Sequence, residues 1–291
     1  MKHGILLAGV IGTVVGAVWL KAEPKGPQGR VARVTDRGCP PDMVRVHEFC
    51  IDRWEASMVD KRSGRPLSPF YPPSPRLLRR VVDLWQRERG TLGPTPARAM
   101  PLPPPSWQLE SDFQPVAVSR PGVVPQAYLS YFSARLACTN AGKRLCTEKE
   151  WTTACRGFRG TLQPYGPAFA SGRCNVHRLQ HAGYLLHGSS SIGHTDPRLN
   201  LVVERGTDFL LRPTGATPSC ASEWDGDAAY DMVGNLDEWI DDETGVFLGG
   251  FYSRSTRQGC EAKISSHAPS YYDYSLGTRC CIDAVGSPQA P

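Results

Sequence analysis

Ten cysteines are the strongest constraint on how this chain of 291 residues can fold. They are spread along the sequence, at Cys39, Cys50, Cys138, Cys146, Cys155, Cys174, Cys220, Cys260, Cys280 and Cys281. They form no CxxC pair and no histidine stands at the spacing of a zinc module, so a structural zinc site is not expected. An even number of scattered cysteines instead predicts disulfides and an oxidising compartment.

The N-terminus also indicates export. A short basic start, Met1-Lys2-His3, precedes an apolar run from Gly4 to Leu20, which is the pattern of a secretory signal. The run is short for a spanning helix but within the range, and no convincing cleavage site follows it. Residues 1–22 are therefore interpreted as a signal peptide or an N-terminal signal-anchor, and residues 23–38, rich in Gly and Pro, as a flexible linker.

Composition excludes one class of partner. The net charge is only +5 and the chain has no dense block of Lys and Arg, so nucleic acid is not expected to bind. With 40% hydrophobic residues, a chain of this length can bury a large core in one big domain or two small ones.

An acidic stretch, DGDAAYDMVGNLDEW from Asp225 to Trp239, is the main candidate site. Its two glycines permit tight turns at which main-chain carbonyls converge. Carboxylates that alternate with such carbonyls provide the oxygen ligands that calcium requires, although the spacing is not that of an EF-hand. A solvated acidic turn explains the same residues equally well, so both readings stay open at this point.

Several local patterns predict secondary structure. Near-alternating apolar residues between Cys39 and Cys50 predict a hairpin that these two cysteines could close. Residues 62–112 are interrupted by prolines and are interpreted as an insertion over the core, with one amphipathic helix whose basic face is read as solvated. A helix is expected after Pro125 and a second one after the capping box of Thr147 and Glu150. Residues 158–224 are expected to be mostly loop, with a strand pair within 201–212.

The apolar faces of two of these helices are predicted from their periodicity. The helix of the insertion is expected to bury Leu77, Leu78, Val81, Val82 and Trp85. The helix after Pro125 is expected to bury Tyr128, Phe132 and Leu136.

The motifs, taken in order, resemble the sulfatase-modifying-factor family, which includes the formylglycine-generating enzymes. They are CPPDMVRVHEFCIDRWEAS, QPVAVS, GKRLCTEKEWTTACRG, YG followed by CNV, YDMVGNLDEW, LGG and LGTRCC. The resemblance implies one α+β domain over residues 39–285, with a mixed, C-type-lectin-like fold, little regular secondary structure, calcium and disulfides.

The resemblance also implies a set of calcium ligands. The first site would use side chains at Asp231 and Glu238 and the carbonyls of Gly234 and Leu236. The second would use Asn175 and Val176, but the acidic partner that completes it in the family falls near Gly215, so this site is weak. Calcium is therefore expected at the first site.

Disulfide pairing follows in part from the resemblance. Members that share these cysteines pair the positions of Cys138 with Cys280 and of Cys155 with Cys260. Elimination then leaves Cys39 with Cys50, Cys146 with Cys281 and Cys174 with Cys220.

The active-site positions of the family are where the resemblance fails. The enzyme binds copper(I) through two cysteines, and thiolates suit this soft metal. The matching positions here are Arg254 and Gly259, while the active-site Ser and Trp positions hold Phe251 and Asp237. Cys260 is explained better as a disulfide partner, so copper is not expected and no catalytic residue is assigned. Four histidines in the long loop, His177, His181, His187 and His194, are interpreted as surface residues rather than metal ligands.

These observations predict a non-catalytic binding or structural module of the cell envelope, exported, stabilised by calcium and possessing a membrane contact only through its N-terminal segment. A protein or glycan partner would bind at a face that contains Tyr252 and Arg254. The alternative is a metal-dependent oxidoreductase, of formylglycine-generating or another type, that acts on a protein or a small molecule. A disulfide at Cys260 would favour the module, and a free thiol the enzyme.

Overall fold

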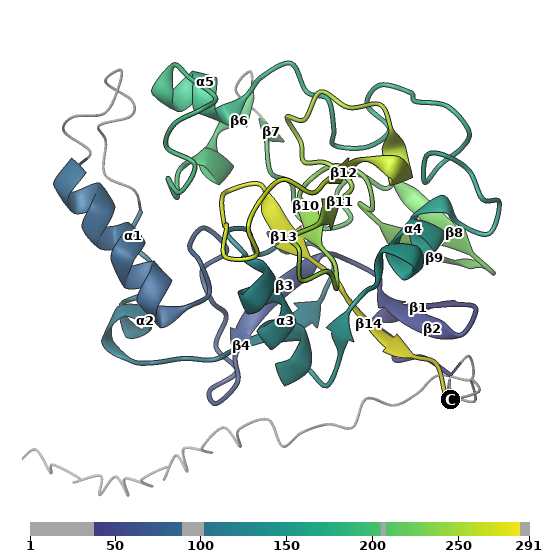
Figure 1. The fold of residues 1–291 in the computed structure, drawn as a ribbon, viewed down its shortest axis with the longest axis horizontal. Helices are drawn as coiled ribbons and strands as arrows, with labels where there is room; N and C mark the ends of the chain where they lie inside the picture. The colour runs from purple at the N-terminus through teal and green to yellow at the C-terminus, as the bar shows by residue number, and fades with distance from the viewer. Residues whose placement is uncertain (1–37, 89–101, 205–207, 286–291) are drawn as a thin grey trace, which may run out of the picture.

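The structure is a computed structural model that describes residues 38–88, 102–204 and 208–285. The expected signal segment, and the linker up to residue 37, lie outside these ranges. Within them, no helix has the length and apolar character needed to cross a membrane. Short helices and five small sheets make up the fold (Figure 1), which confirms the expected α+β class.

The first four-stranded sheet joins the two ends of the domain. Its order is β1 (Met43–Val46), β2 (Phe49–Asp52), β14 (Cys280–Asp283) and β5 (Arg144–Leu145), and all its neighbouring strands are antiparallel. The expected hairpin is confirmed as β1–β2, and its turn places His47 at φ 50°. Val44, Val46 and Ile51 are buried, because they alternate onto the core side of the sheet.

The second four-stranded sheet lies at the centre of the candidate site. Its order is β12 (Lys263–Ile264), β11 (Phe247–Leu248), β10 (Asp237–Trp239) and β13 (Leu276–Thr278). β10 and β13 run parallel, whereas the other pairs are antiparallel. All three residues of β10 are buried, so the two carboxylates at its start are inside the protein.

Three two-stranded sheets complete the strand structure. β3 (Ala56–Asp60) pairs with β4 (Pro115–Ser119), and β8 (Ala221–Trp224) with β9 (Asp227–Tyr230). β6 (Val203–Glu204) pairs with β7 (Asp208–Phe209), which confirms the strand pair expected within 201–212. The acidic stretch therefore begins as the turn of the β8–β9 hairpin and ends as strand β10.

Both predicted central helices begin at a capping box. Ser130 caps α3 (Tyr131–Asn140), and Thr147 caps α4 (Glu148–Arg156) through the expected reciprocal bonds with Glu150. The expected apolar face of α3 is wrong. Tyr128 precedes the helix at φ 61°, and Phe132 and Leu136 are 58% and 48% exposed. The buried face is instead built of Tyr131, Ser133, Ala134, Ala137 and Cys138.

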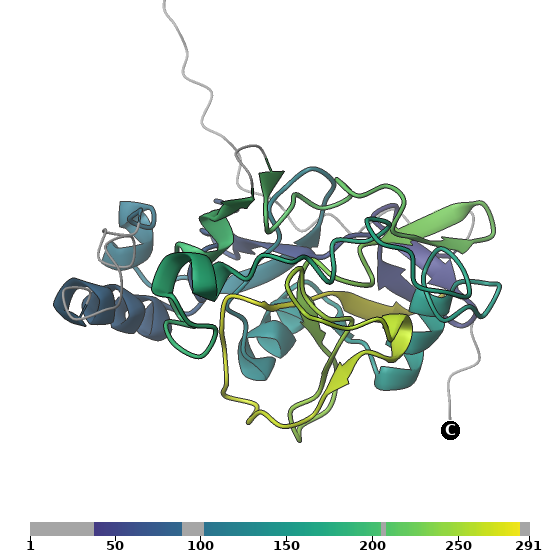
Figure 2. The same ribbon diagram turned by 90° about the horizontal axis from the view of Figure 1, so that it is seen from above.

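The insertion contributes α1 (Pro75–Glu88) and α2 (Ser106–Glu110), which lie together at one end of the molecule (Figures 1 and 2). Leu78, Val81 and Trp85 are buried against the core, which confirms the predicted amphipathic face of α1. The long loop, expected to have little regular structure, contains the short helix α5 (Ala182–His187). Gly188 ends this helix at φ 71°, and Gly183 is accommodated inside it. In the part of the chain that the structure describes, Leu199–Leu201 and Gly259–Glu261 form 3₁₀ turns.

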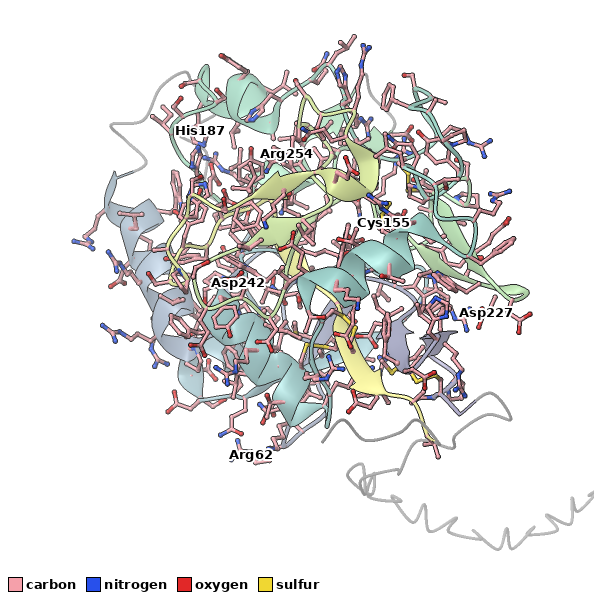
Figure 3. All side chains as sticks on the ribbon, turned by 45° about the vertical axis from the view of Figure 1, so that its right-hand side comes forward. Arg62, Cys155, His187, Asp227, Asp242 and Arg254 are labelled. Atoms are coloured by element: carbon pink, nitrogen blue, oxygen red, sulfur yellow. A yellow bond between two sulfur atoms is a disulfide. The ribbon has the colours of Figure 1, made fainter. Side chains whose placement is uncertain are left out.

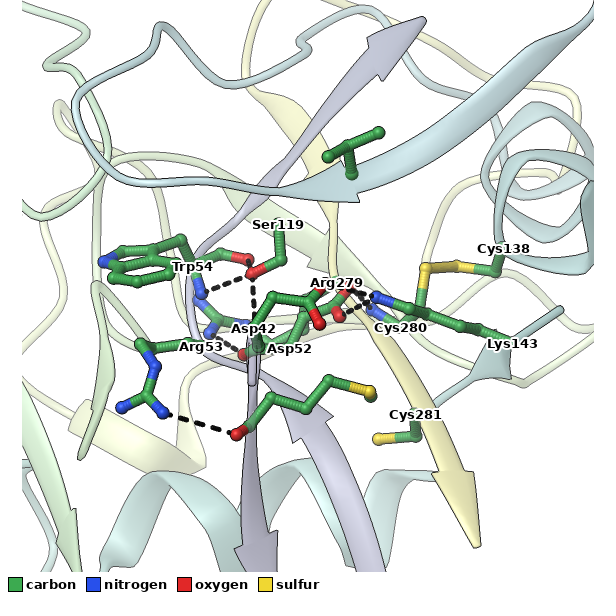
Figure 4. Close-up of polar contacts among 12 residues, drawn as sticks. Asp42, Asp52, Arg53, Trp54, Ser119, Cys138, Lys143, Arg279, Cys280 and Cys281 are labelled. Atoms are coloured by element: carbon green, nitrogen blue, oxygen red, sulfur yellow. Dashed lines mark hydrogen bonds and ion pairs between the residues drawn. A yellow bond between two sulfur atoms is a disulfide. The ribbon is translucent and has the colours of Figure 1, made fainter. Parts of the chain in front are cut away.

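A buried polar network holds the C-terminal strand to the first hairpin (Figure 4). Asp52 forms an ion pair with Lys143 and accepts the main-chain N–H of Cys280 at 3.0 Å. Arg279 donates to the main-chain oxygen of Asp52, also at 3.0 Å. Because Asp52 and Arg279 are both fully buried, these contacts determine how β14 lies against β2.

All ten cysteines are paired, in the five disulfides Cys39–Cys50, Cys138–Cys280, Cys146–Cys281, Cys155–Cys260 and Cys174–Cys220. These are the pairs given above. Four of them close loops of 46 to 142 residues, and each such cross-link stabilises by about 2–4 kcal/mol. A fold with so few regular elements depends on them.

Candidate functional site

Three carboxylates and one guanidinium are buried together beneath the loop that leads into β10. Glu55, Asp231, Glu238 and Arg279 are each at most 3% exposed. Three carboxylates against one guanidinium leave an excess of negative charge when all are ionised, and Arg212 is a further cation that acts on Asp231. Buried charge of one sign requires protons or a cation to offset it.

Glu238 is held firmly in this cluster. Arg279 donates to both of its oxygens at 2.7 Å in a bidentate pair, and the indole N–H of Trp151 donates to Oε2, also at 2.7 Å. Trp151 comes from α4, so the second predicted helix positions this carboxylate. Such fully desolvated, bidentate geometry fixes the side chain in one orientation.

The loop from Asp231 to Asn235 has an unusual backbone. Asp231, Gly234 and Asn235 all have positive φ, at 56°, 82° and 62°. A Cβ atom added to Gly234 would lie 2.3 Å from the carbonyl oxygen of Asn175, so only glycine fits there. Asp231 accepts the N–H of Gly215 at 2.7 Å. The loop is therefore tightly constrained from both sides.

Glu55 braces the same loop and was not identified from the sequence. It accepts the N–H of Leu236 at 3.1 Å and the side-chain amide of Asn235 at 2.6 Å. It stands in the first family motif, but a single glutamate before a strand gives no local signal of such a role. Burial, with Asp231 and Glu238 nearby, raises the pKa of Glu55 well above its usual value. Burial likewise raises the pKa of Asp231 to about 6.

A second group of residues lies beside this cluster, around Asp237. The guanidinium of Arg254 forms an ion pair with Asp237, which also accepts the N–H of Gly250 at 2.9 Å. Arg254 lies over the ring of Phe251 at 5.5 Å, a cation–π contact. Burial raises the pKa of Asp237 to about 6, and Arg254 opposes this shift. The side chain of Asp237 is 2% exposed and that of Arg254 25%.

Gly259 and Cys260 follow in the next turn. Gly259 has φ 56°, and a Cβ atom there would lie 2.3 Å from the carbonyl oxygen of Leu162. Cys260 is bonded to Cys155. Neither position can present a thiolate in this structure.

The four loop histidines do not come together as a metal centre. Nε2 of His181 is hydrogen-bonded to the hydroxyl of Tyr274 at 3.2 Å, and Nδ1 of His194 to the hydroxyl of Tyr271 at 3.3 Å. Nε2 of His187 lies 2.9 Å from Oδ2 of Asp196. His187 is buried, so its interpretation as a surface residue is wrong. In the described ranges, no three His, Cys, Asp or Glu side chains are grouped to hold a metal ion, so any ion would need main-chain oxygens too.

Comparison with known proteins identifies the family. The family model of the sulfatase-modifying factor enzyme 1-like domain matches residues 24–284. The chain belongs to this family.

The curated relatives include proteins named as a formylglycine-generating enzyme and as an inactive one. The chain is 28% identical to the formylglycine-generating enzyme of Mus musculus over 184 residues, which is 55% of this chain and 44% of that protein. It is 30% identical to the inactive C-alpha-formylglycine-generating enzyme 2 of Bos taurus over 121 residues, 40% of this chain and 32% of that protein. The matched region thus spans less than half of the length of these relatives.

Two solved structures align over most of this chain. "Major Tropism Determinant I1 Variant" aligns with a TM-score of 0.41 at 13% identity, over 84% of this chain and 53% of that one. PvdO from Pseudomonas aeruginosa aligns with a TM-score of 0.38 at 14% identity, over 89% of both chains.

At the first expected calcium site, the carboxylates of Asp231 and Glu238 are hard oxygen donors of the kind that calcium takes. Both oxygens of Glu238 already accept hydrogen bonds from Arg279, so this carboxylate neighbours a cation. The side chain at the weak second site is engaged in a similar way. The side-chain oxygen of Asn175 accepts from Arg178 at 3.2 Å, and its N–H groups donate to Leu210 and Asn235. Asn175 thus links the segments that contain Leu210 and Asn235, and its side-chain oxygen already contacts the guanidinium of Arg178.

The expected binding face needs correction. Tyr252 is fully buried and donates its hydroxyl to Asn200 at 3.0 Å, because the loop after β11 folds inward. Arg254 is turned toward Asp237. Tyr252 therefore offers no surface to a partner, and Arg254 offers only the quarter of its side chain that is exposed.

Proposed function

We propose that this protein is a non-catalytic member of its family, an exported, calcium-stabilised binding or structural module of the cell envelope. One observation carries the proposal. Resemblance assigns four positions to the family's active site, and three of them contact one another. Asp237 and Arg254 form an ion pair, and Arg254 lies over the ring of Phe251 in a cation–π contact. Substitutions that complement each other in this way replace a reactive site with a packed one.

Copper chemistry has no ligands at these positions. A copper(I) centre of the family type needs thiolates, and all ten cysteines of this chain are in disulfides. Gly259 has no room for a side chain next to the carbonyl of Leu162. A single substitution back to cysteine would therefore not restore the site.

The proposal gives calcium a structural role. Asp231, Glu238 and the carbonyls of Gly234 and Leu236 would hold the ion, and its charge would offset the excess negative charge around Glu55. Bound calcium would stabilise the folded loop before β10. Export is supported by the disulfides, which persist in oxidising compartments such as the periplasm or the exterior of the cell.

Two measurements on the purified protein test the proposal. The midpoint of thermal unfolding is expected to rise when calcium is added after chelation, and to do so far less in Asp231→Asn. Oxygen consumption with cysteine-containing peptides and added copper(I) is expected to equal that of the same mixture without the protein. Copper-dependent turnover of such a peptide would overturn the non-catalytic assignment and favour the oxidoreductase.

A further inference from the structure

A positively charged hollow lies at the start of α1. Arg62, which lines it, lies far from Arg254 in Figure 3. It is a cavity of about 690 Å³ lined by Lys61, Arg62, Arg76 and Arg79 together with Asp60 and Asp112. Figure 3 shows Arg62 directed away from the domain at its lower edge. Four cations face two carboxylates in this cavity.

Neither carboxylate neutralises the arginines effectively. Both oxygens of Asp60 already accept hydrogen bonds. One accepts from the N–H and hydroxyl of Ser63, at 2.9 and 2.6 Å, and the other from the N–H of Gln114 at 3.1 Å. Asp112 contacts Arg79 at 3.4 Å, and the two side chains are 85% and 48% exposed. An exposed pair of this kind contributes little, so it can open to admit another anion.

The helix adds to the positive field. α1 has no acidic residue in its first turn, and Arg76 and Arg79 lie near its N-terminus. The N-terminal end of a helix has a partial positive charge that favours anions. Guanidinium groups suit carboxylates in particular, because they can bind them in a bidentate manner.

An apolar groove continues from this cavity. It has a volume of about 380 Å³, and it shares Ser74, Pro75, Arg76 and Phe113 with the basic cavity. On its other side stand Phe132 and Leu136 of α3, which are 58% and 48% exposed. These are the two side chains whose helical spacing predicted burial. Their place on the groove gives them a role at the surface.

Charge complementarity disfavours the chain's own remaining segments as the occupant, because none of them has an excess of acidic side chains. Residues 89–101 contain two arginines and no acidic residue, and residues 1–37 contain six Lys and Arg against two Asp and Glu. Residues 286–291 have no charged side chain, and a second copy of the chain would bring a net charge of +5. Charge complementarity therefore points to a separate, acidic partner.

We propose that this surface, called the α1 cleft, docks an acidic segment of a partner protein. Carboxylates of the segment bind Arg62, Arg76 and Arg79, and one large apolar side chain enters the groove beside Phe132 and Leu136. Buried apolar anchors flanked by charged contacts are typical of peptide recognition. The proposal gives a partner class to the binding module proposed above, and it uses residues that have no part in the Asp237 region.

The test selects ligands for the full-length protein from a phage-displayed library of random 12-residue peptides. Enriched peptides are expected to be rich in Asp and Glu around one Phe, Leu or Trp. Affinity of the best peptide is then measured by fluorescence anisotropy. Arg76→Glu is expected to weaken it by at least about tenfold, and Phe132→Ser by about fivefold or more.

Matched controls separate this cleft from a general charge effect. Arg87→Glu changes an exposed arginine at the other end of α1. Tyr184→Ser changes an aromatic side chain of α5 that is 60% exposed. Each is expected to change affinity less than about twofold. Unchanged unfolding midpoints would show that all four variants are folded.

Three outcomes would overturn the proposal. In the first, the selected peptides contain no more Asp and Glu than the unselected library. In the second, Arg76→Glu and Phe132→Ser leave the affinity of the best peptide unchanged. The third is binding to vesicles containing phosphatidylglycerol that needs Arg76 but not Phe132, with no peptide binding, because that pattern assigns the cleft to lipid headgroups. Copper-dependent turnover would refute the non-catalytic function without altering peptide affinity, so the two proposals fail separately.

Discussion

The ion pair between Asp237 and Arg254 can be tested by a double-mutant cycle. If it is a packed replacement for the family's active site, each partner should stabilise the fold chiefly through the other. Arg254→Met leaves the Asp237 carboxylate buried, with the N–H of Gly250 as its remaining donor. Asp237→Asn keeps that bond and leaves a guanidinium that can turn toward solvent.

The expected costs follow from burial. Removing one partner of a fully buried pair costs about 3–5 kcal/mol. The side chain of Arg254 is 25% exposed, so we expect about 2–3 kcal/mol for Arg254→Met. Asp237→Asn should cost about 1 kcal/mol, because the exposed arginine regains water. The double variant should cost about 2 kcal/mol, which gives a coupling energy of about 1–2 kcal/mol.

The assay is equilibrium unfolding in urea with disulfides intact. It is run at pH 8, because the pKa of Asp237 is about 6 and the carboxylate must be ionised in the wild type. Arg87→Met is a control with an exposed side chain and should cost less than about 0.5 kcal/mol. Additive costs of the two single variants, with no coupling, would refute the claim that these positions have adapted to one another.

Three further predictions concern the surrounding structure. In urea unfolding, Gly259→Ala should lower the free energy of unfolding by at least about 2 kcal/mol more than Gly122→Ala does. Both glycines have positive φ, but of the two only Gly259 has atoms within 4 Å of an added Cβ. Glu150→Gln should cost about 1 kcal/mol at pH 7. The pKa of Glu150 is lowered in the fold, with hydrogen bonds from Arg144 and Thr147 outweighing burial, so its contribution is present above pH 4.5 and lost as the pH falls. Unfolding curves of the two proteins should therefore converge near pH 3, and a constant difference would contradict this reasoning. Asp231→Asn should lower calcium affinity by at least about tenfold in isothermal titration, whereas equal affinities would exclude Asp231 as a ligand.

Local patterns in the sequence predicted the elements whose physics is local. The box of Thr147 and Glu150 forms because its partners are three residues apart, and the β1–β2 hairpin forms from alternation next to a short turn. The face of α3 was mispredicted because small residues fill it. Ala134, Ala137 and Cys138 pack closely on β4 and β14 yet add little to an apolar periodicity, whereas Phe132 and Leu136 dominate it.

The contacts of the candidate site depend on distant residues and could not be predicted from spacing. Glu55 reaches a loop 180 residues further along the chain, and no pattern near it marks that contact. Asp237 and Arg254 were each recognised as substituted positions, but only the structure shows that they pair. Tyr252 follows a Gly-Gly turn typical of exposed loops, yet its ring packs inward among Tyr128, Phe251 and Tyr274.

The central claim is that the family's active site has become a packed, non-catalytic region, and a thiol count with metal analysis tests it most directly. The purified full-length protein is denatured without reductant, titrated with a thiol reagent, and analysed for copper and calcium before and after incubation with copper(I). The account predicts no free thiol, no tightly bound copper and calcium near one equivalent. A reactive thiol at Cys260 together with stoichiometric copper would contradict it.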